Sequence, residues 1–484
     1  MKVGIELPGS LRCENKRAGK HTHNCSGVEM QETSPLSPQS PVMPLSEFLP
    51  ALFWALDGEG VHFCVLRNYE GFPANNVGSD VDFLIYPAEL QRVLRAVLSI
   101  QGIRIVGYMQ RSYVASMFLE GTASIDGSRS LQLDFLWSLS WKEMPYLPAS
   151  GVLQSAMPYS AGNLKFFVPL PVHEAIISLL TSLIYGGWAR EKYLPGVQRT
   201  FSGNRLEVVA ALTPQFGRRT ATRLVDTVIR GDRREIHRCV WLIRVALTLR
   251  SLLQRPFRSI QGIVRYYARE IAIRFSPRYM TTVCILCPDD CGKAAIINNL
   301  MPLLHSAAKC VEKRHFSLRL PFARESSRIS ASADRHAQTP DGPFVSMAKI
   351  VLWLLQEWLG QFIGKKNCTL RLFVNYYHDL LFDPKRYNYR GPMWFARLIG
   401  RLTPSPDLWI LLDPAAERMQ SMNHEVLPAQ KLSQLEACCS FVKTRNRYVV
   451  LDAGKPAASV TEEAYSAVID MLARRADKLI KNRL

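Results

Sequence analysis

The sequence predicts a mixed α/β protein whose C-terminal part is a doubly wound parallel sheet. Two observations lead to this prediction. Short apolar runs bounded by turn residues alternate with stretches of helical apolar spacing in residues 45–147, and the same alternation returns from residue 281 onward. A helix-rich stretch separates the two regions. Strands that are joined through helices favour parallel pairing, with helices covering both faces of the sheet.

Length and charge limit the classes of protein to which the chain can belong. Its 484 residues, 48% of them apolar, are enough for two or three domains with cores of their own. The net charge of +19 favours phosphates, nucleic acid or anionic lipid as partners. No apolar stretch has the roughly 20 residues that cross a bilayer, and the N-terminus lacks the apolar core of a secretory signal. We therefore expect a cytoplasmic protein without a transmembrane segment, whose eleven cysteines are reduced.

Composition along the chain predicts a tail followed by a first domain. Residues 1–44 are polar and rich in Ser and Pro, and they lack periodic apolar residues, so we expect a disordered tail. Residues 45–171 are predicted to form one compact domain. Its expected elements are helices at 45–56 and 88–100 and strands at 61–66, 81–86 and 131–137.

Residues 172–279 are predicted to form a basic helical domain, with helices at 174–185, 206–212, 218–230 and 234–253. Fifteen arginines lie between Arg218 and Arg278, against four acidic residues. A solvated basic face, a polyanion-binding surface and contact with a membrane surface all agree with this pattern. The sequence leaves these three alternatives open.

The last segment, residues 280–484, shows the order strand, turn, helix that begins a nucleotide-binding α/β domain. The expected strands lie at 283–286, 369–374 and 408–412, and the expected helices at 294–304 and 344–362, with a polar loop over 321–343. This spacing predicts the doubly wound parallel sheet.

Three aspartates form the first candidate site. A strand alternates its side chains, so Asp80 and Asp82 lie on one face while Val81 and Phe83 enter the core. Asp134 lies within an apolar strand, where an unpaired charge is costly to bury. If the two strands are neighbours, the three carboxylates converge and could hold Mg²⁺ or Mn²⁺ with a nucleoside triphosphate. Two solvated acids and one paired, buried Asp are the alternative interpretation.

These residues resemble the nucleotidyltransferase superfamily typified by DNA polymerase beta, and in particular a bacterial branch with Leu66-Arg67-Asn68, Asp80-x-Asp82 and Leu-Gln-x-Asp134. The resemblance covers about residues 50 to 190. It implies that Asp80 and Asp82 bind the metals and that Asp134 completes the site and helps to activate the acceptor hydroxyl. It also implies that Gly78 and Ser79 contact the triphosphate.

The sequence departs from this superfamily at one position of the nucleotide site. A Gly-Gly or Gly-Ser pair usually precedes the paired acids, whereas Arg67 and Asn68 stand in that place. Either Arg67 binds a phosphate instead, so that both residues belong to the nucleotide site, or the triphosphate site is weakened.

A modified phosphate loop forms the second candidate site. In residues 287–295, Gly292 and Lys293 keep two of the four fixed positions of the G-x-x-x-x-G-K-[ST] motif. Cys287 replaces the first glycine, and Ala294 replaces the hydroxyl that binds Mg²⁺. Asp289, Gly292 and Lys293 are the candidate nucleotide-binding residues here.

Residues 376–387 and 404–408 resemble the thymidylate-kinase-like branch of the P-loop kinases. The resemblance implies that His378 and Asp379 shape a substrate pocket. Val374 and Asn375 stand where this branch usually has Asp-Arg, and Met422 stands where its lid usually has Arg. These losses remove groups that phosphoryl transfer needs, so we expect a pseudokinase that retains nucleotide binding.

The combined hypothesis is an Mg²⁺-dependent nucleotidyltransferase that uses a nucleoside triphosphate and an unknown acceptor and carries an inactive kinase-like domain. Such proteins resemble ones found with bacterial surface-polysaccharide synthesis, which implies a sugar-linked or protein hydroxyl as acceptor; this is an analogy at the level of the fold. A nucleotide kinase with a modified loop and a nucleotide-sensing scaffold are the alternatives.

Overall fold

A computed structural model describes residues 43–74, 80–120, 122–123, 130–276, 280–287, 293–308, 310–316, 342–363, 369–413 and 429–484. The chain is a mixed α/β protein, as the sequence predicts, and its described residues form many helices and two five-stranded sheets. The predicted tail lies almost wholly outside the described residues, and so does nearly all of the predicted polar loop.

The first sheet is mixed and carries the three aspartates. Its strand order is β2 (Phe63–Val65), β3 (Asp80–Ile85), β7 (Ser130–Leu136), β5 (Val114–Glu120) and β4 (Arg104–Gln110). Strands β3 and β7 are parallel, and the other neighbours are antiparallel. Asp82 pairs in register with Asp134, so the two predicted acidic strands are indeed neighbours.

The two faces of this sheet differ in chemistry because the strands alternate. Helices α1 (Leu45–Gly58) and α2 (Leu90–Ser99) pack on one face together with Val81 and Phe83, which are 1% and 0% exposed. The prediction that these two residues enter the core is confirmed. Asp80 and Asp82 therefore lie on the opposite face, toward the helical region that follows.

The helical region covers residues 149–275 together with two small hairpins. Its helices are α3 (Ala149–Gln154), α4 (Pro171–Gly186), α5 (Leu194–Gly203), α6 (Arg205–Phe216), α7 (Arg218–Arg230), α8 (Arg233–Gln254) and α9 (Pro256–Phe275). The four predicted helices are present as α4, α6, α7 and α8, and α3, α5 and α9 are additional. Helices α4 to α8 share one hydrophobic cluster with Cys64, Leu66 and Leu84 of the first sheet.

Short paired strands complete the N-terminal half. They are β1 (Met43–Pro44) with β6 (Thr122–Ala123), β8 (Leu139–Trp141) with β9 (Met144–Leu147), and β10 (Met157–Ala161) with β11 (Leu164–Val168). The hairpin of β8 and β9 lies against α4 and α8, so it belongs to the layer that faces the aspartates.

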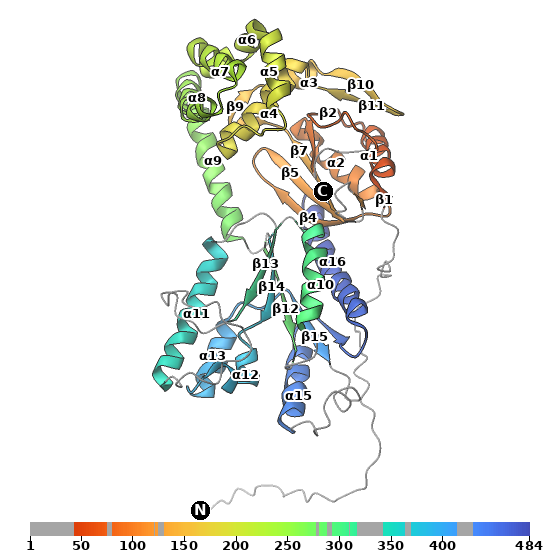
Figure 1. Ribbon diagram of the computed structural model, residues 1–484, viewed down its shortest axis with the longest axis vertical. Coiled ribbons are helices and arrows are strands. Elements are labelled where there is room, and N and C mark those ends of the chain that lie inside the picture. Colours follow the sequence, from red (N-terminus) through yellow and green to blue (C-terminus); the bar gives the residue numbers. More distant parts are fainter. Residues whose placement is uncertain are drawn as a thin grey trace, which may run out of the picture. The chain divides into compact units, whose positions relative to one another are not determined.

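The second sheet is parallel throughout, as the sequence predicts. Its order is β13 (Cys310–His315), β14 (Thr369–Asn375), β12 (Met280–Leu286), β15 (Leu408–Asp413) and β16 (Tyr448–Asp452). Val283 and Ile285 pack against α10 (Lys293–Ala307) and α16 (Ala457–Lys481). On the other face lie α11 (Pro343–Ile363), α12 (Asp379–Phe382), α13 (Met393–Leu402) and α15 (Ala429–Lys443) (Figure 1). The sheet is therefore doubly wound.

The last helix, α16, also packs on the first sheet. Arg104 of β4 forms an ion pair of 2.7 Å with Asp470 of α16. The hydroxyl of Tyr465 donates a hydrogen bond of 3.2 Å to Glu120. Val106 and Phe118 belong to the same hydrophobic cluster as residues of α16. Strands β4 and β5 and helix α16, which are far apart in the sequence, therefore stabilise one another.

The structure also bears on the expected absence of a transmembrane helix and on the state of the cysteines. Among the described residues, none of the helices combines the length and apolar character needed to cross a bilayer. Cys64, Cys239, Cys284, Cys310, Cys438 and Cys439 are free. Cys287 is disulfide-bonded, so the expectation of reduced cysteines is wrong at this position.

Candidate metal and nucleotide site

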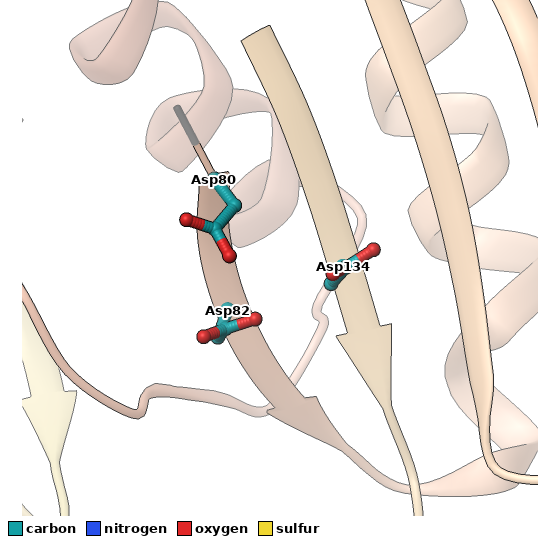
Figure 2. Close-up of side chains that lie close together, drawn as sticks. All are labelled: Asp80, Asp82 and Asp134. Atoms are coloured by element: carbon teal, nitrogen blue, oxygen red, sulfur yellow. The ribbon is translucent and has the colours of Figure 1, made fainter. Parts of the chain in front are cut away.

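Three aspartates from two neighbouring strands lie together on one face of the first sheet (Figure 2). Strand β3 supplies Asp80 and Asp82, and β7 supplies Asp134. One ligand atom from each carboxylate lies within 4.8 Å of those of the other two. Asp82 is buried, whereas Asp80 and Asp134 are partly exposed. The structure thus brings together the three acids that the sequence singles out.

The negative charge of Asp82 is energetically unfavourable in this buried position. Burial raises the pKa of Asp82 above its usual range, the guanidinium of Arg67 acts in the opposite direction, and the neighbouring Asp80 raises it further. The positive charge of Arg190, a residue distant in the sequence, also lowers the pKa of Asp82. A cation bound between the carboxylates would relieve the same repulsion.

Arg67 is the nearest positive charge to the acids. Its Nε donates a hydrogen bond of 2.5 Å to Oδ2 of Asp82, and the Arg67 side chain is almost fully buried. The guanidinium also lies 5.4 Å from the ring centroid of Tyr193. Burial alone would lower the pKa of Arg67, but the charges around it, above all that of Asp82, outweigh this effect and raise it. The assignment of Arg67 to a phosphate stays a prediction.

Asn68 has an unusual backbone and a defined partner. Its φ of 60° is left-handed, a conformation that Asn tolerates better than most residues with a Cβ. Its side-chain amide exchanges hydrogen bonds of 3.0 and 3.1 Å with the hydroxyl of Tyr193. Asn68 thereby fixes Tyr193 beside Arg67. Gly78 and Ser79, the predicted triphosphate contacts, lie outside the described residues.

Gln132 also belongs to the site, in a role that its place in the sequence motif does not reveal. Its Nε2 donates to both carboxylate oxygens of Asp134 at 2.8 Å. Two residues apart on β7, Gln132 and Asp134 share a face, and Gln132 pairs in register with Asp80. The signal was present in the sequence as the Leu-Gln-x-Asp134 spacing. Gln132 orients the third carboxylate.

A cavity of about 470 Å³ opens beside the acids. Asp82, Asp134 and Arg67 line it from the sheet side, and Thr181 and Tyr185 line it from α4. This volume falls within the range of small-molecule sites, which is about 300–1,000 Å³. The cavity places a polar, acid-lined surface of the sheet opposite a wall rich in hydroxyl groups.

Aromatic and basic side chains also line the cavity. Arg111, Trp188 and Arg190 belong to this lining, together with Tyr113, whose ring centroid lies 5.6 Å from that of Tyr185. Trp188 is 65% exposed and follows Gly187, whose φ of 81° ends α4 and redirects the chain. Arginines beside an aromatic pair can contact the phosphates and base of a nucleotide.

Sequence reasoning missed these lining residues because no motif marks them. They come from the turn between β4 and β5 and from the segment that follows α4, and only the fold brings them to one place. The local signal is the Gly186-Gly187 pair. This pair predicts that the preceding helix ends here and that the chain then changes direction.

The second candidate site is described only in part. Asp289 and Gly292 lie outside the described residues. Lys293 is the first residue of α10, and its Nζ donates a hydrogen bond of 3.0 Å to Oδ1 of Asn375. Asn375 ends β14, and it follows Val374 at the two positions where the thymidylate-kinase-like branch usually has Asp-Arg. A neutral amide here holds the lysine without adding negative charge.

His378 lies inside an aromatic cage rather than at an open surface. It is 4% exposed, and its ring centroid lies 4.7 Å from that of Phe441 and 5.3 Å from that of Trp409. Burial and, less strongly, the charge of Arg445 lower the pKa of His378 to about 3. His378 is therefore a neutral core residue of the second sheet near pH 7.

The burial of His378 predicts a pH-dependent stability. The unfolded chain protonates this residue as the pH falls through its ordinary value of 6.5, whereas the native state stays neutral down to pH about 3. The unfolded state therefore binds more protons, and His378 should cost about 5 kcal/mol of stability between these pH values. Denaturant titrations should show a flatter acid dependence for His378→Gln than for wild type, and no change for the exposed control His62→Gln. Equal slopes for His378→Gln and wild type would contradict the prediction.

Comparisons with known proteins find similarity among solved structures. No family model matches the chain, and no curated protein matches it. Among solved structures, a thymidylate kinase from Candida albicans is similar at 14% sequence identity and a TM-score of 0.26. The match covers 39% of this chain and 90% of that chain.

Proposed function

We propose that the chain is a nucleotidyltransferase that uses Mg²⁺ or Mn²⁺ and transfers a nucleotidyl group from a nucleoside triphosphate to a hydroxyl acceptor. The observation that carries this proposal is the convergence of Asp80, Asp82 and Asp134 beside a cavity of about 470 Å³. Three carboxylates on one face of a sheet can bind a metal ion and can also accept a proton.

The donor set fits a hard divalent cation. Carboxylate oxygens are the ligands that Mg²⁺ prefers, and the repulsion between Asp80 and Asp82 is relieved when a cation binds them. Arg67 uses Oδ2 of Asp82, and no described residue donates a hydrogen bond to Oδ1. Asp80, Asp82 and Asp134 would hold the metal. When bound, it would act as a Lewis acid that neutralises the triphosphate charge.

The protein side chains have separate tasks in this reaction. The acceptor hydroxyl oxygen attacks the α-phosphorus, the bond from that phosphorus to the bridging oxygen breaks, and pyrophosphate leaves with the electron pair. In this proposal Asp134 would accept the hydroxyl proton. The two hydrogen bonds from Gln132 hold its carboxylate in orientation. Arg111 and Arg190 contribute positive charge toward the departing pyrophosphate.

Transfer of radioactive label tests this function. Full-length protein is incubated with each α-³²P nucleoside triphosphate, Mg²⁺ or Mn²⁺, and cell extract that supplies acceptors. Wild type should transfer label, and the Asp80→Ala, Asp82→Ala double variant should not. Asp477→Ala, a surface acid paired with Lys481, is the matched control and should behave as wild type. A folded wild-type protein that transfers no label with any nucleotide would reject the proposal.

A nucleotide-sensing scaffold is the second candidate function. It is favoured by the ion pair of Arg67 with Asp82, because an internal cation already neutralises part of the acidic cluster. A sensor should bind a nucleotide with equal affinity in wild type and in Asp82→Ala. Loss of metal-dependent nucleotide binding in that variant would instead favour the transferase. Equilibrium dialysis with labelled nucleotide distinguishes the two.

A further inference from the structure

Trp188 has an exposed aromatic ring at the acidic cavity. It lines the cavity of about 470 Å³, and the residue is 65% exposed. In the part of the chain that the structure describes, no other aromatic ring and no cationic side chain stacks on its indole. A large flat ring beside a polar cavity is suited to contact a planar group of a ligand.

The backbone that carries Trp188 is fixed on both sides. Gly187 ends α4 with a left-handed φ of 81°, a conformation that glycine adopts without strain. Nδ1 of His237 donates a hydrogen bond of 2.6 Å to the carbonyl oxygen of Gly187. Beyond Trp188, the N–H of Tyr193 donates a hydrogen bond of 3.1 Å to the carbonyl oxygen of Arg190. Little order therefore has to be gained in this segment when a ligand binds.

The protein covers one side of the Trp188 ring and leaves the rest accessible. A Cβ placed on Gly186 would lie 3.5–3.7 Å from three atoms of the indole, so the ring lies over this glycine. Tyr113 and Tyr185, which also line the cavity, have ring centroids 5.6 Å apart and planes inclined by 31°. Each of these two rings covers part of the other. Trp188 therefore offers the larger free aromatic surface.

Arg190 connects this ring to the acidic cluster. Arg190 lines the same cavity, and its positive charge lowers the pKa of Asp82, which places the guanidinium on the side of the acids. Trp188 and Arg190 are two positions apart, so their Cα atoms are separated by at most about 7 Å. In a nucleotide, the ribose spans a similar length between the base and the α-phosphate. The segment thus presents an aromatic surface and a cation to the two ends of a nucleotide.

We propose that the indole of Trp188 stacks on the base of the nucleoside triphosphate while the acids and arginines of the cavity hold its phosphates. The contact rests on the proposed function and adds to it the group that binds the base. The covalent link from base to phosphates selects the nucleotide over the acceptor, because the phosphates are held in the same cavity. Every base has a π-face, so the stack strengthens the binding of all four nucleotides.

A nucleotide analogue that cannot react tests the contact separately from catalysis. In α,β-methylene ATP and α,β-methylene UTP, a CH₂ group replaces the oxygen that would leave with pyrophosphate. Calorimetry with full-length protein and Mg²⁺ should show that Trp188→Ala binds both analogues about 10-fold more weakly than wild type. Trp188→Phe keeps a ring and should retain most of the affinity. Inorganic tripolyphosphate, which has no base, should bind equally to wild type and Trp188→Ala.

A control variant and the pattern of losses identify the cause. Trp241 is 71% exposed on α8 and does not line the cavity, so Trp241→Ala should bind both analogues as wild type does. Equal affinity of wild type and Trp188→Ala for the analogues would overturn the stack, and so would an equal loss for tripolyphosphate. Either result would leave nucleotidyl transfer standing. A wild type that binds neither analogue nor tripolyphosphate would reject both proposals.

The kinetics of label transfer give a second readout. The base keeps its contacts while the phosphorus reacts, so Trp188 should stabilise the bound substrate and the transition state equally. Trp188→Ala should therefore raise KM by about 10-fold and leave kcat nearly unchanged. A lower kcat at an unchanged KM would contradict a role in binding the base.

Discussion

Replacing Asp134 with asparagine is expected to lower the rate of label transfer by about 10³-fold or more, while the protein stays folded. Asparagine keeps the shape of the side chain and an oxygen that can accept from Gln132, but it loses the charge that binds a metal and accepts a proton. A loss of 10³-fold corresponds to about 4 kcal/mol of transition-state stabilisation. Initial rates at saturating nucleotide measure it directly.

Two controls separate the chemistry of Asp134 from its structural surroundings. Asp226→Asn removes a surface carboxylate that pairs with Arg205, and it should leave the rate unchanged. Gln132→Ala should give a smaller loss than Asp134→Asn, because it frees the carboxylate without removing it. Transfer at the wild-type rate by a folded Asp134→Asn protein would remove the third acid from the mechanism.

Replacing Arg67 with methionine is expected to destabilise the protein by about 3–5 kcal/mol. Methionine fills much of the same volume, but it leaves the buried carboxylate of Asp82 without its ion-pair partner. Breaking one half of a buried ion pair has this cost because the remaining charge is neither solvated nor neutralised. Urea unfolding should show a lower midpoint with an unchanged slope.

A double-variant cycle tests whether charge is the cause. Asp82→Asn combined with Arg67→Met removes both charges, so the double variant should lose clearly less stability than the sum of the two single variants. Mg²⁺ should stabilise Arg67→Met more than Asp82→Asn, because the first variant keeps the carboxylate. Additive losses without any effect of Mg²⁺ would mean that Arg67 acts through packing alone.

Alternation along the strands made the acidic site predictable. Val81 and Phe83 are buried while Asp80 and Asp82 share the other face, and a period of two residues requires this division. The parallel second sheet was equally accessible, because strands that alternate with helices leave few other topologies. In both cases the information lies within a few neighbouring residues.

Contacts between distant segments were not predictable in the same way. The sequence identifies Arg67 as a candidate site residue, but only the fold shows that Asp82 and Tyr193 are its neighbours. The apolar periodicity of α9 looks the same whether the helix is buried or exposed, so the exposure of Phe257 and Val264 had to come from the structure. The three-domain layout stays a prediction.

The packing of α16 on β4 has a consequence for how the chain can be divided. A fragment that ends near residue 276 would contain the whole acidic site but lack α16. Val106 and Phe118, now 5% and 6% exposed, would then face water, and Arg104 would lose Asp470. The part of the chain that carries the acidic site is therefore not an autonomous module, because helix α16 covers its outer strand.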